Sequence, residues 1–233
     1  IEAGEVAELE PEVKAVGAVL SPSTGIIDSH AFMLSLQSDI ESHGGMIAFL
    51  TKVIEIESSG ANRIVRTPDF ELAAQWIINS AGLSAPELAI DTPDAPRGFY
   101  AKGHYYKYSG VNPFDALIYP LPNESSQGLH VGFDMSHQLR FGPDISWVDE
   151  IDYVFDESLK EKFIHSIHNY WPGMEPERLH PDYCGIRPKI QKPSEKMQDF
   201  SIQFPKDHKI EGFVNLQGIE SPGITSSLAI GKY

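Results

Sequence analysis

The segment over residues 212–231 constrains the fold more than any other stretch of the sequence. It reads GFVNLQGIESPGITSSLAIG, an apolar run followed by a turn of Gly, Ser and Pro and then by small residues. The run predicts a strand that ends at Gln217, and we expect Ser221 to cap a helix over 224–230 that has Pro222 at its first position. Backbone N–H groups at such a helix start have no acceptor within the helix, so they favour negative charge. An ordinary strand-to-helix turn is the alternative.

A second apolar run, residues 72–79 (LAAQWIIN), leads into the small residues Ser80-Ala81-Gly82. A continuous apolar run is typical of a strand buried on both faces. Open α/β sheets bind ligands where such strands end. The other elements expected nearby are a helix from a cap at Asp28 or Ser29 to Gly44-Gly45, and strands over 46–57 and 63–67.

The pattern changes after residues 91–98 (DTPDAPRG), whose two Pro and one Gly predict a boundary. Short apolar runs separated by hairpin-like turns then favour an antiparallel sheet. One helix interrupts them, with Asp156 as its cap and Trp171-Pro172-Gly173 after its end. The strands expected here are 99–108, 115–121, 127–134, 138–142, 183–190, 199–204 and 212–217.

Charge and composition exclude several classes of function. The 233 residues include 18 Lys and Arg against 33 Asp and Glu, a formal net charge of −15, and so acidic a surface repels nucleic-acid phosphates. The single cysteine, Cys184, excludes an intramolecular disulfide framework and a cysteine-rich zinc site. His165 and His168 stand three apart on the predicted helix without a convincing third ligand, so we predict no metal site. No apolar run is long enough to span a membrane.

Six motifs follow one another in an order that resembles one branch of the flavoenzymes. They are SPSTGIIDSHAFMLSLQSDIESHGG, KGHYYKYSG, LIYPLP, GLHVGFDMSHQLRFGPD, YCGIRPKI and LQGIESPGITSSLAIG. In this order they resemble the L-2-hydroxyglutarate dehydrogenases and oxidases, within the D-amino-acid-oxidase-like superfamily of FAD-dependent oxidoreductases, and the resemblance covers essentially all of residues 1–233. The family keeps a phosphate-binding GxGxxG turn near its N-terminus, and this sequence has none. We therefore expect a cut piece, the C-terminal part of such an enzyme, which is inactive alone.

The resemblance implies a mixed fold, α/β in one part and α+β in the other. Residues 27–90 and 205–233 would form a partial FAD-binding α/β layer. Residues 1–26 and 97–204 would form a substrate-binding domain, a mainly antiparallel β-sheet with helices. FAD is the implied cofactor.

The resemblance also implies a reaction, in which FAD accepts a hydride from the carbon that bears the hydroxyl group of an L-2-hydroxy acid. L-2-hydroxyglutarate is the leading substrate, and 2-oxoglutarate would be its product. His130 is the first choice for the base that takes the hydroxyl proton, because an imidazole titrates near working pH. Arg187 is the expected carboxylate anchor, since a guanidinium forms two hydrogen bonds with a carboxylate. A structural histidine and a solvated surface arginine are the alternatives.

Four further residues are candidates for binding the substrate. Lys102 and His104 stand two apart and hence on one face of a strand, where they could hold the distal carboxylate of a diacid. A solvent-facing edge strand is the alternative. Tyr105 and Tyr119 either line the pocket or pack within the sheet.

Contacts with the cofactor are implied motif by motif. Val53 lies on the expected strand that meets the adenine end in similar proteins, and Ala81 and Gly82 lie near the flavin or the diphosphate. N–H donors of the last helix would stabilise negative charge on the reduced flavin. The residues that resemble the loop around the pyrimidine edge of the flavin are Gly218, Ile219, Glu220, Ser221, Gly223, Ile224 and Thr225.

Two other functions stay open. One is a related flavin amine or amino-acid oxidase or glycerol-3-phosphate dehydrogenase. The other is a non-catalytic binding domain, or a subunit that needs another chain for the nucleotide site. The electron acceptor is open between oxygen, a quinone and an electron-transfer protein. We expect a cytoplasmic location, with peripheral contact to a membrane left open.

Overall fold

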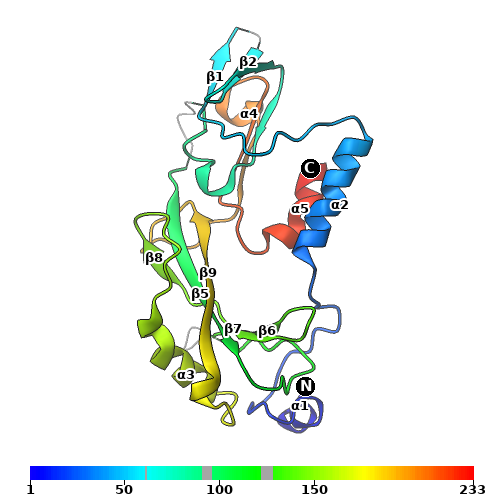
Figure 1. The fold of residues 1–233 in the computed structure, drawn as a ribbon, viewed down its shortest axis with the longest axis vertical. Helices are drawn as coiled ribbons and strands as arrows, with labels where there is room; N and C mark the ends of the chain where they lie inside the picture. Colours follow the sequence, from blue (N-terminus) through cyan, green and yellow to red (C-terminus); the bar gives the residue numbers. More distant parts are fainter. Residues whose placement is uncertain (61, 91–95, 122–127) are drawn as a thin grey trace. The chain divides into compact units, whose positions relative to one another are not determined.

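The computed structural model describes residues 1–60, 62–90, 96–121 and 128–233 (Figure 1). It forms two compact units. The first comprises Ile1–Ile47, Lys102–Ser146 and Tyr153–Gly185, and the second comprises Ala48–Ala101, Trp147–Asp152 and Ile186–Tyr233. The FAD-binding and substrate-binding domains expected from the sequence stay a prediction. The helices are α1 (Ala3–Leu9), α2 (Ser29–Ser42), α3 (Lys160–His168), α4 (Pro205–His208) and α5 (Gly223–Lys232), with 3-10 turns η1 (Gly82–Ser84), η2 (Glu157–Leu159) and η3 (Pro176–Arg178).

Two long strands, β5 (Phe99–Tyr108) and β9 (Leu179–Lys189), pair with each other and run through the sheet of the first unit. β5 is antiparallel to β7 (Leu139–Phe141), which is antiparallel in turn to β6 (Val131–Phe133). β8 (Ser146–Val148) also pairs with β5. The strands expected over 99–108, 138–142 and 183–190 are thereby confirmed.

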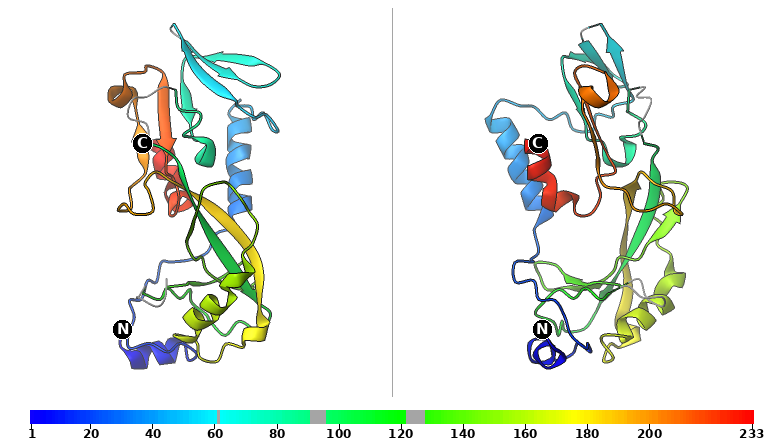
Figure 2. Two further views of the ribbon diagram at one scale, coloured as in Figure 1. Left: turned by 90° about the vertical axis from the view of Figure 1, so that its left-hand side faces the viewer. Right: turned by 180° about the vertical axis from the view of Figure 1, so that it is seen from behind.

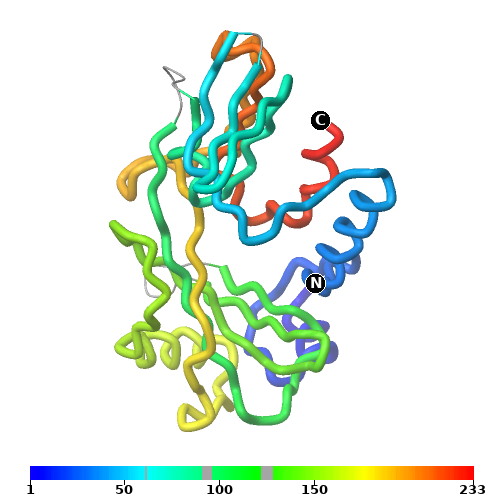
Figure 3. The backbone as a smooth tube through the Cα atoms, turned by 45° about the horizontal axis from the view of Figure 1, so that its top comes forward, coloured from blue at the N-terminus to red at the C-terminus, as the bar shows by residue number. Residues whose placement is uncertain are grey.

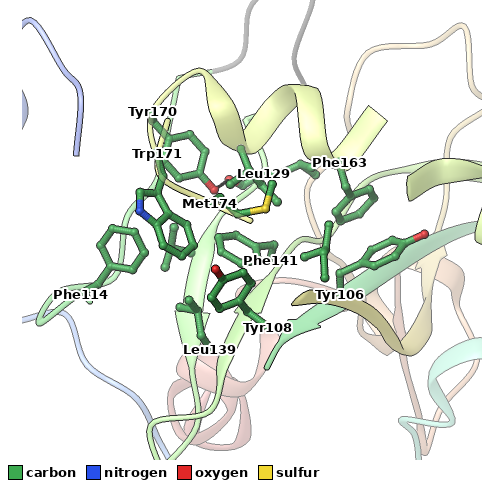
Figure 4. Packing of buried hydrophobic residues seen from close by; sticks show 13 residues of the cluster. Tyr106, Tyr108, Phe114, Leu129, Leu139, Phe141, Phe163, Tyr170, Trp171 and Met174 are labelled. Carbon is green, nitrogen blue, oxygen red and sulfur yellow. Dashed lines mark hydrogen bonds between the residues drawn. The ribbon is translucent and has the colours of Figure 1, made fainter. Parts of the chain in front are cut away.

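Aromatic side chains form the core of the first unit between this sheet and α3, as Figure 4 shows. The ring centroids of Tyr106 and Phe163 lie 4.6 Å apart, and Trp171 contacts Tyr108 at 5.0 Å and Phe114 at 5.2 Å. Burying one such side chain stabilises a fold by about 1.5–3 kcal/mol. The cluster therefore holds β5 against α3.

Two helices of the first unit begin as the sequence predicts. The carboxylate of Asp28 accepts the amide of Ala31 at 3.0 Å at the start of α2. Asp156 accepts the amide of Ser158 at 3.0 Å ahead of α3. Both caps satisfy amides that a helix start leaves without an acceptor.

The second unit contains two three-stranded sheets. In the first, β1 (Glu55–Ser59), β2 (Asn62–Arg66) and β3 (Glu71–Ala74) pair in chain order, and Figure 3 traces this antiparallel ribbon in cyan. In the other, β11 (Phe213–Gln217) lies between β10 (Ser201–Gln203) and β4 (Ile77–Asn79). β11 is parallel to β4 and antiparallel to β10. β11 then leads into α5, drawn in red in Figure 2, so the predicted strand-turn-helix is confirmed.

Residues 72–79 do not form the one buried strand that the sequence predicts, because the run divides between β3 and β4 in different sheets. The backbone of Gly212 approaches the carbonyl of Gln75 so closely that a side chain would have no room, and it accepts the amide of Ile77 at 2.8 Å. β4 is the edge strand of its sheet, so Ile78 is 66% exposed.

The strand expected over 46–57 begins only at Glu55. Its partner β2 ends at Arg66, which pairs with Glu55 and accepts the amide of Ile54 at 2.9 Å, so the ladder with β2 ends there. Val53 consequently lies just before the strand that was predicted to contain it.

The strand expected over 115–121 is reduced to an isolated bridge between Ile118 and Val131, because its partner β6 is only three residues long. β8 and α4 were not predicted from the sequence, because β8 has only three residues and α4 only four. Residues 91–95 of the predicted boundary, and Gln127 of the strand expected over 127–134, lie outside the described residues.

Candidate functional site

The loop between β11 and α5 keeps backbone groups available for a ligand. Gly218 has a φ of 67°, and a Cβ at this position would lie only 3.0–3.1 Å from side-chain atoms of Ile190. α5 begins at Gly223 after Pro222, and none of the described side chains caps it, so the cap expected at Ser221 is wrong. The amide of Gly223 donates to the carbonyl of Glu220, so the donors that the start of α5 can offer a ligand are the next amides, those of Ile224 and Thr225.

Three charged side chains meet beside this loop. Lys189, at the end of β9, donates from Nζ to Glu220 Oε1 of the loop, while Arg187 Nη1 lies 3.8 Å from Glu220 Oε2. The side chain of Lys189 is 5% exposed, whereas that of Arg187 is 32% exposed. The ammonium is therefore neutralised inside the protein, and the guanidinium keeps surface that a carboxylate can reach.

Lys189 is not among the site residues predicted from the sequence. The signal was present, since Lys189 stands two residues after Arg187 on a predicted strand and such residues share a face. Its carboxylate partner, Glu220, lies 31 residues away in the sequence, so no local pattern connects the two.

Gln217, the last residue of β11, indicates that a polar partner belongs at this loop. It is 1% exposed, and among the described residues neither atom of its side-chain amide has a hydrogen-bond partner. Leaving a buried polar group unpaired costs about 1–3 kcal/mol, so folded proteins rarely do so. The free amide, the uncapped helix start and the close-packed Gly218 together fit the polar edge of a flavin ring.

The end of β4 is tied to β11 by a buried amide pair. Asn79 Nδ2 donates to Asn215 Oδ1 at 2.9 Å and to the carbonyl of Ala85 at 2.8 Å. Asn79 Oδ1 accepts the amide of Ala81 at 3.3 Å, just before Gly82 turns the chain with a φ of 59°. The network fixes the turn in which the predicted cofactor contacts Ala81 and Gly82 lie.

In the first unit, the structure brings His130 and Tyr119 together, two of the residues predicted for the site. Their ring centroids lie 4.1 Å apart at 47°. Tyr105 stacks on Tyr183 at 4.7 Å and 19°, and burial raises the pKa of the Tyr183 phenol. These pairs place imidazole and phenol groups on half-exposed surface of the same unit.

Lys102 and His104 are buried, so the alternative of a solvent-facing strand is wrong for both. His104 Nδ1 lies 2.9 Å from Asp144 Oδ1, and Lys102 Nζ donates to the carbonyl of Val154 at 3.0 Å. Both alternate with Tyr105 along β5 and share the face of Tyr106, which packs on α3. Their role in binding a distal carboxylate stays a prediction.

The hairpin of β6 and β7 carries a charged cluster on its surface. Arg140 donates to Asp134 Oδ2 at 2.8 Å and to Asp182 Oδ2 at 2.6 Å. Hydrogen bonds from Ser136, and then from Arg140, lower the pKa of the Asp134 carboxyl. His137 is exposed beside them. Arg140 is thus held by two carboxylates of its own unit.

Among the described residues, no group of three or more His, Cys, Asp and Glu could hold a metal ion. His165 is exposed, and His168 Nε2 lies 2.9 Å from the carbonyl of Met174. Cys184 is half-buried and its thiol donates to the carbonyl of Tyr153. In the part of the chain that the structure describes, no helix has the length and apolar character needed to cross a membrane.

Comparison with known proteins relates the chain to flavoenzymes. The family described as "FAD dependent oxidoreductase" (DAO) matches residues 1–233. The chain is 34% identical to the mitochondrial L-2-hydroxyglutarate dehydrogenase of Arabidopsis thaliana, over 100% of this chain and 58% of that protein. It is 25% identical to the glycerol 3-phosphate dehydrogenase of Caloramator mitchellensis, over 98% of this chain and 48% of that protein.

Among solved structures, the L-alpha-glycerophosphate oxidase of Mycoplasma pneumoniae with FAD bound matches with a TM-score of 0.79 and 20% identity. The match covers 99% of this chain and 62% of that one. The likeness confirms the mixed α/β fold class. The chain spans only part of these proteins: it covers 58% of the length of the relative from Arabidopsis thaliana.

Proposed function

The chain belongs to the FAD dependent oxidoreductase family, and from this premise we propose that the intact protein oxidises L-2-hydroxy acids, with L-2-hydroxyglutarate as the leading substrate. The family confirms the expectation of FAD as cofactor. The similarity to an L-2-hydroxyglutarate dehydrogenase over the whole chain supports the substrate. The observation that carries the proposal is Arg187, a guanidinium with open surface beside a loop that fits a flavin edge.

In this proposal the loop from Gly218 to Thr225 holds the flavin ring, through the amides at the start of α5 and the free amide of Gln217. When bound, FAD supplies the acceptor for the hydride that leaves the carbon bearing the hydroxyl group. Arg187 binds the carboxylate next to that carbon by two parallel hydrogen bonds, which fixes the orientation of the substrate.

The proton of the hydroxyl group goes to a ring nitrogen of His130. Loss of one hydride and one proton leaves the 2-oxo acid, so atoms and charge balance. Tyr119 packs against the imidazole and restricts its orientation. A neutral imidazole is a competent base near neutral pH, and a positioned base contributes about 10²–10⁴-fold to a rate.

The test is anaerobic mixing of the intact, FAD-loaded protein with L-2-hydroxyglutarate, followed through the absorbance of oxidised flavin. We expect the absorbance to fall with the L-enantiomer and to persist with the D-enantiomer. If the protein holds FAD and no L-2-hydroxy acid reduces it, the proposal is wrong.

Arg187→Ala should raise KM for L-2-hydroxyglutarate by about tenfold or more, because a charge-assisted hydrogen bond contributes about 1.5–3 kcal/mol. Lys192→Ala, a change at an exposed lysine of the same stretch, is the control. An unchanged KM for Arg187→Ala would contradict the anchor role.

A flavin dehydrogenase for glycerol 3-phosphate is the second candidate, and the relative from Caloramator mitchellensis favours it. Such a substrate presents a phosphate and no carboxylate. Reduction of the flavin by glycerol 3-phosphate, with L-2-hydroxyglutarate inert, would identify this function instead.

A further inference from the structure

Arg187, the proposed carboxylate anchor, shares the carboxylate of Glu220 with Lys189. Glu220 is the counter-ion of two cations at once, and its side chain is 10% exposed. Its Oε1 accepts from the ammonium of Lys189, while its Oε2 lies 3.8 Å from Arg187 Nη1, beyond hydrogen-bond distance. The Glu220 carboxylate therefore forms a hydrogen-bonded ion pair with Lys189, whereas it lies near Arg187 without a hydrogen bond to it.

We propose that Lys189 is a positioning residue, whose ammonium holds the Glu220 carboxylate away from Arg187 and so keeps the guanidinium free for a substrate carboxylate. The inference rests on the proposed anchor role of Arg187. Lys189 itself is too deeply buried to reach a substrate.

The charges of the three side chains support this assignment. Two cations and one anion leave one positive charge, so the cluster can accept one further carboxylate. Without the ammonium, Glu220 would be a nearly buried anion whose nearest cation is Arg187. A buried charge strongly favours a partner, so the two would pair. The cluster would then be neutral, and the guanidinium would no longer be free to bind a substrate.

The ends of β9 and of the loop are also fixed to each other, so this geometry is defined by packing. Ile190, next to Lys189, packs against Gly218. The carbonyl of Glu220 accepts the amide of Gly223, the first residue of α5. The carboxylate of Glu220 therefore projects from a backbone held at both sides.

The test measures the affinity of the intact, FAD-loaded protein for glutarate, a dicarboxylate that has no hydroxyl group to oxidise, by titration calorimetry. Lys189→Met should raise Kd by about tenfold, the loss of one charge-assisted contact. The double variant Lys189→Met/Glu220→Gln should recover wild-type Kd to within about threefold, since nothing then competes for Arg187. Lys192→Met is the matched control for loss of a lysine charge.

Recovery in the double variant separates positioning from general structural support. A purely structural lysine predicts that the double variant binds glutarate as weakly as Lys189→Met or more weakly, and that result overturns the inference, as does wild-type affinity in Lys189→Met. Glu220→Gln alone is a second test, which stands even where Lys189→Met does not fold. It should bind glutarate at least as tightly as wild type, and weaker binding overturns the inference.

Flavin reduction by L-2-hydroxy acids is recorded on the same samples, so the two proposals can fail separately. If no hydroxy acid reduces the flavin but the order of glutarate affinities holds, the proposed function is wrong and the role of Lys189 stands. Reduction without that order overturns the role of Lys189 alone. A wild-type protein that does not bind glutarate overturns it too.

Discussion

Asp144 offers a sharp test of how the buried polar groups of β5 are satisfied. Its side chain is fully buried, and its Oδ1 accepts both the backbone amide of His104 at 2.7 Å and the imidazole Nδ1–H at 2.9 Å. Its Oδ2 accepts Ser146 Oγ at 3.2 Å. Asp144→Ala would leave a buried amide and a buried imidazole N–H without acceptors.

The expected cost follows from these contacts. A buried donor that loses its partner costs about 1–3 kcal/mol, so the two donors of His104 together predict a loss of about 2–6 kcal/mol in unfolding free energy. Asp144→Asn keeps a carbonyl oxygen in the place of Oδ1 and should cost about 1 kcal/mol. The difference between the two variants isolates the missing acceptor from the missing charge.

Hydrogen exchange of the peptide covering residues 102–108, read by mass spectrometry, measures this locally. We expect protection to fall strongly in Asp144→Ala and little in Asp144→Asn. Asp149→Ala, a change at an exposed aspartate nearby, is the control. If alanine costs less than about 1 kcal/mol, or if asparagine is as damaging as alanine, the hydrogen bonds of Asp144 do not hold β5 as argued.

Three further outcomes follow from burial and charge. Phe163→Ala should lower the urea unfolding free energy by about 3–5 kcal/mol, against less than about 1 kcal/mol for the half-exposed Phe70→Ala, and equal losses would contradict the core assignment. Burial raises the pKa of Glu10 above 4.5, so its contribution to stability is present below 4.5 and is lost as pH rises through the raised pKa. Glu10→Gln should make the urea midpoint less dependent on pH in the range above 4.5 where Glu10 titrates, and an unchanged pH profile would refute this. Hydrogen bonds lower the pKa of Asp134 below 3.8, so its contribution is present above 3.8 and is lost as pH falls through the lowered pKa. Asp134→Asn should remove that acid-side loss, and a wild-type profile in the variant would count against the hydrogen bonds of Ser136 and Arg140.

Helix starts could be predicted from the sequence because their cause is local. Asp28 and Asp156 each accept an amide two or three residues ahead, so a few adjacent letters contain the whole interaction. The strand before α5 was equally clear, since an apolar run, a turn and a small-residue helix follow one another directly. The cap of α5 was predicted wrongly: the N-cap residue is Pro222 and not Ser221, and no described side chain accepts an amide at this helix start.

Strand limits and site pairings could not be predicted, because they depend on residues far away in the chain. The break in the run 72–79 is set by the backbone of Gly212 against Gln75. Lys102 and His104 are buried because each finds a polar partner in a loop distant in the sequence: Val154 for Lys102 and Asp144 for His104. Alternation along β5 showed that the two share a face, but nothing in it showed which face packs on α3.

The charge of the whole chain is likewise a poor guide to the charge of the site. A net charge of −15 opposes the approach of an anionic substrate at long range, and salt screens this repulsion beyond about 10 Å. The proposed binding of a carboxylate at Arg187 would then depend on the nearest groups, since Arg187, Lys189 and Glu220 leave one positive charge. Because Lys189 and Glu220 are both nearly buried, their pairing is screened little by salt, and the guanidinium of Arg187 is the one group of the three that solvent screens. Added salt should therefore weaken the binding of a carboxylate at Arg187 while the Lys189–Glu220 pair stays formed, which is the condition that the positioning role of Lys189 requires.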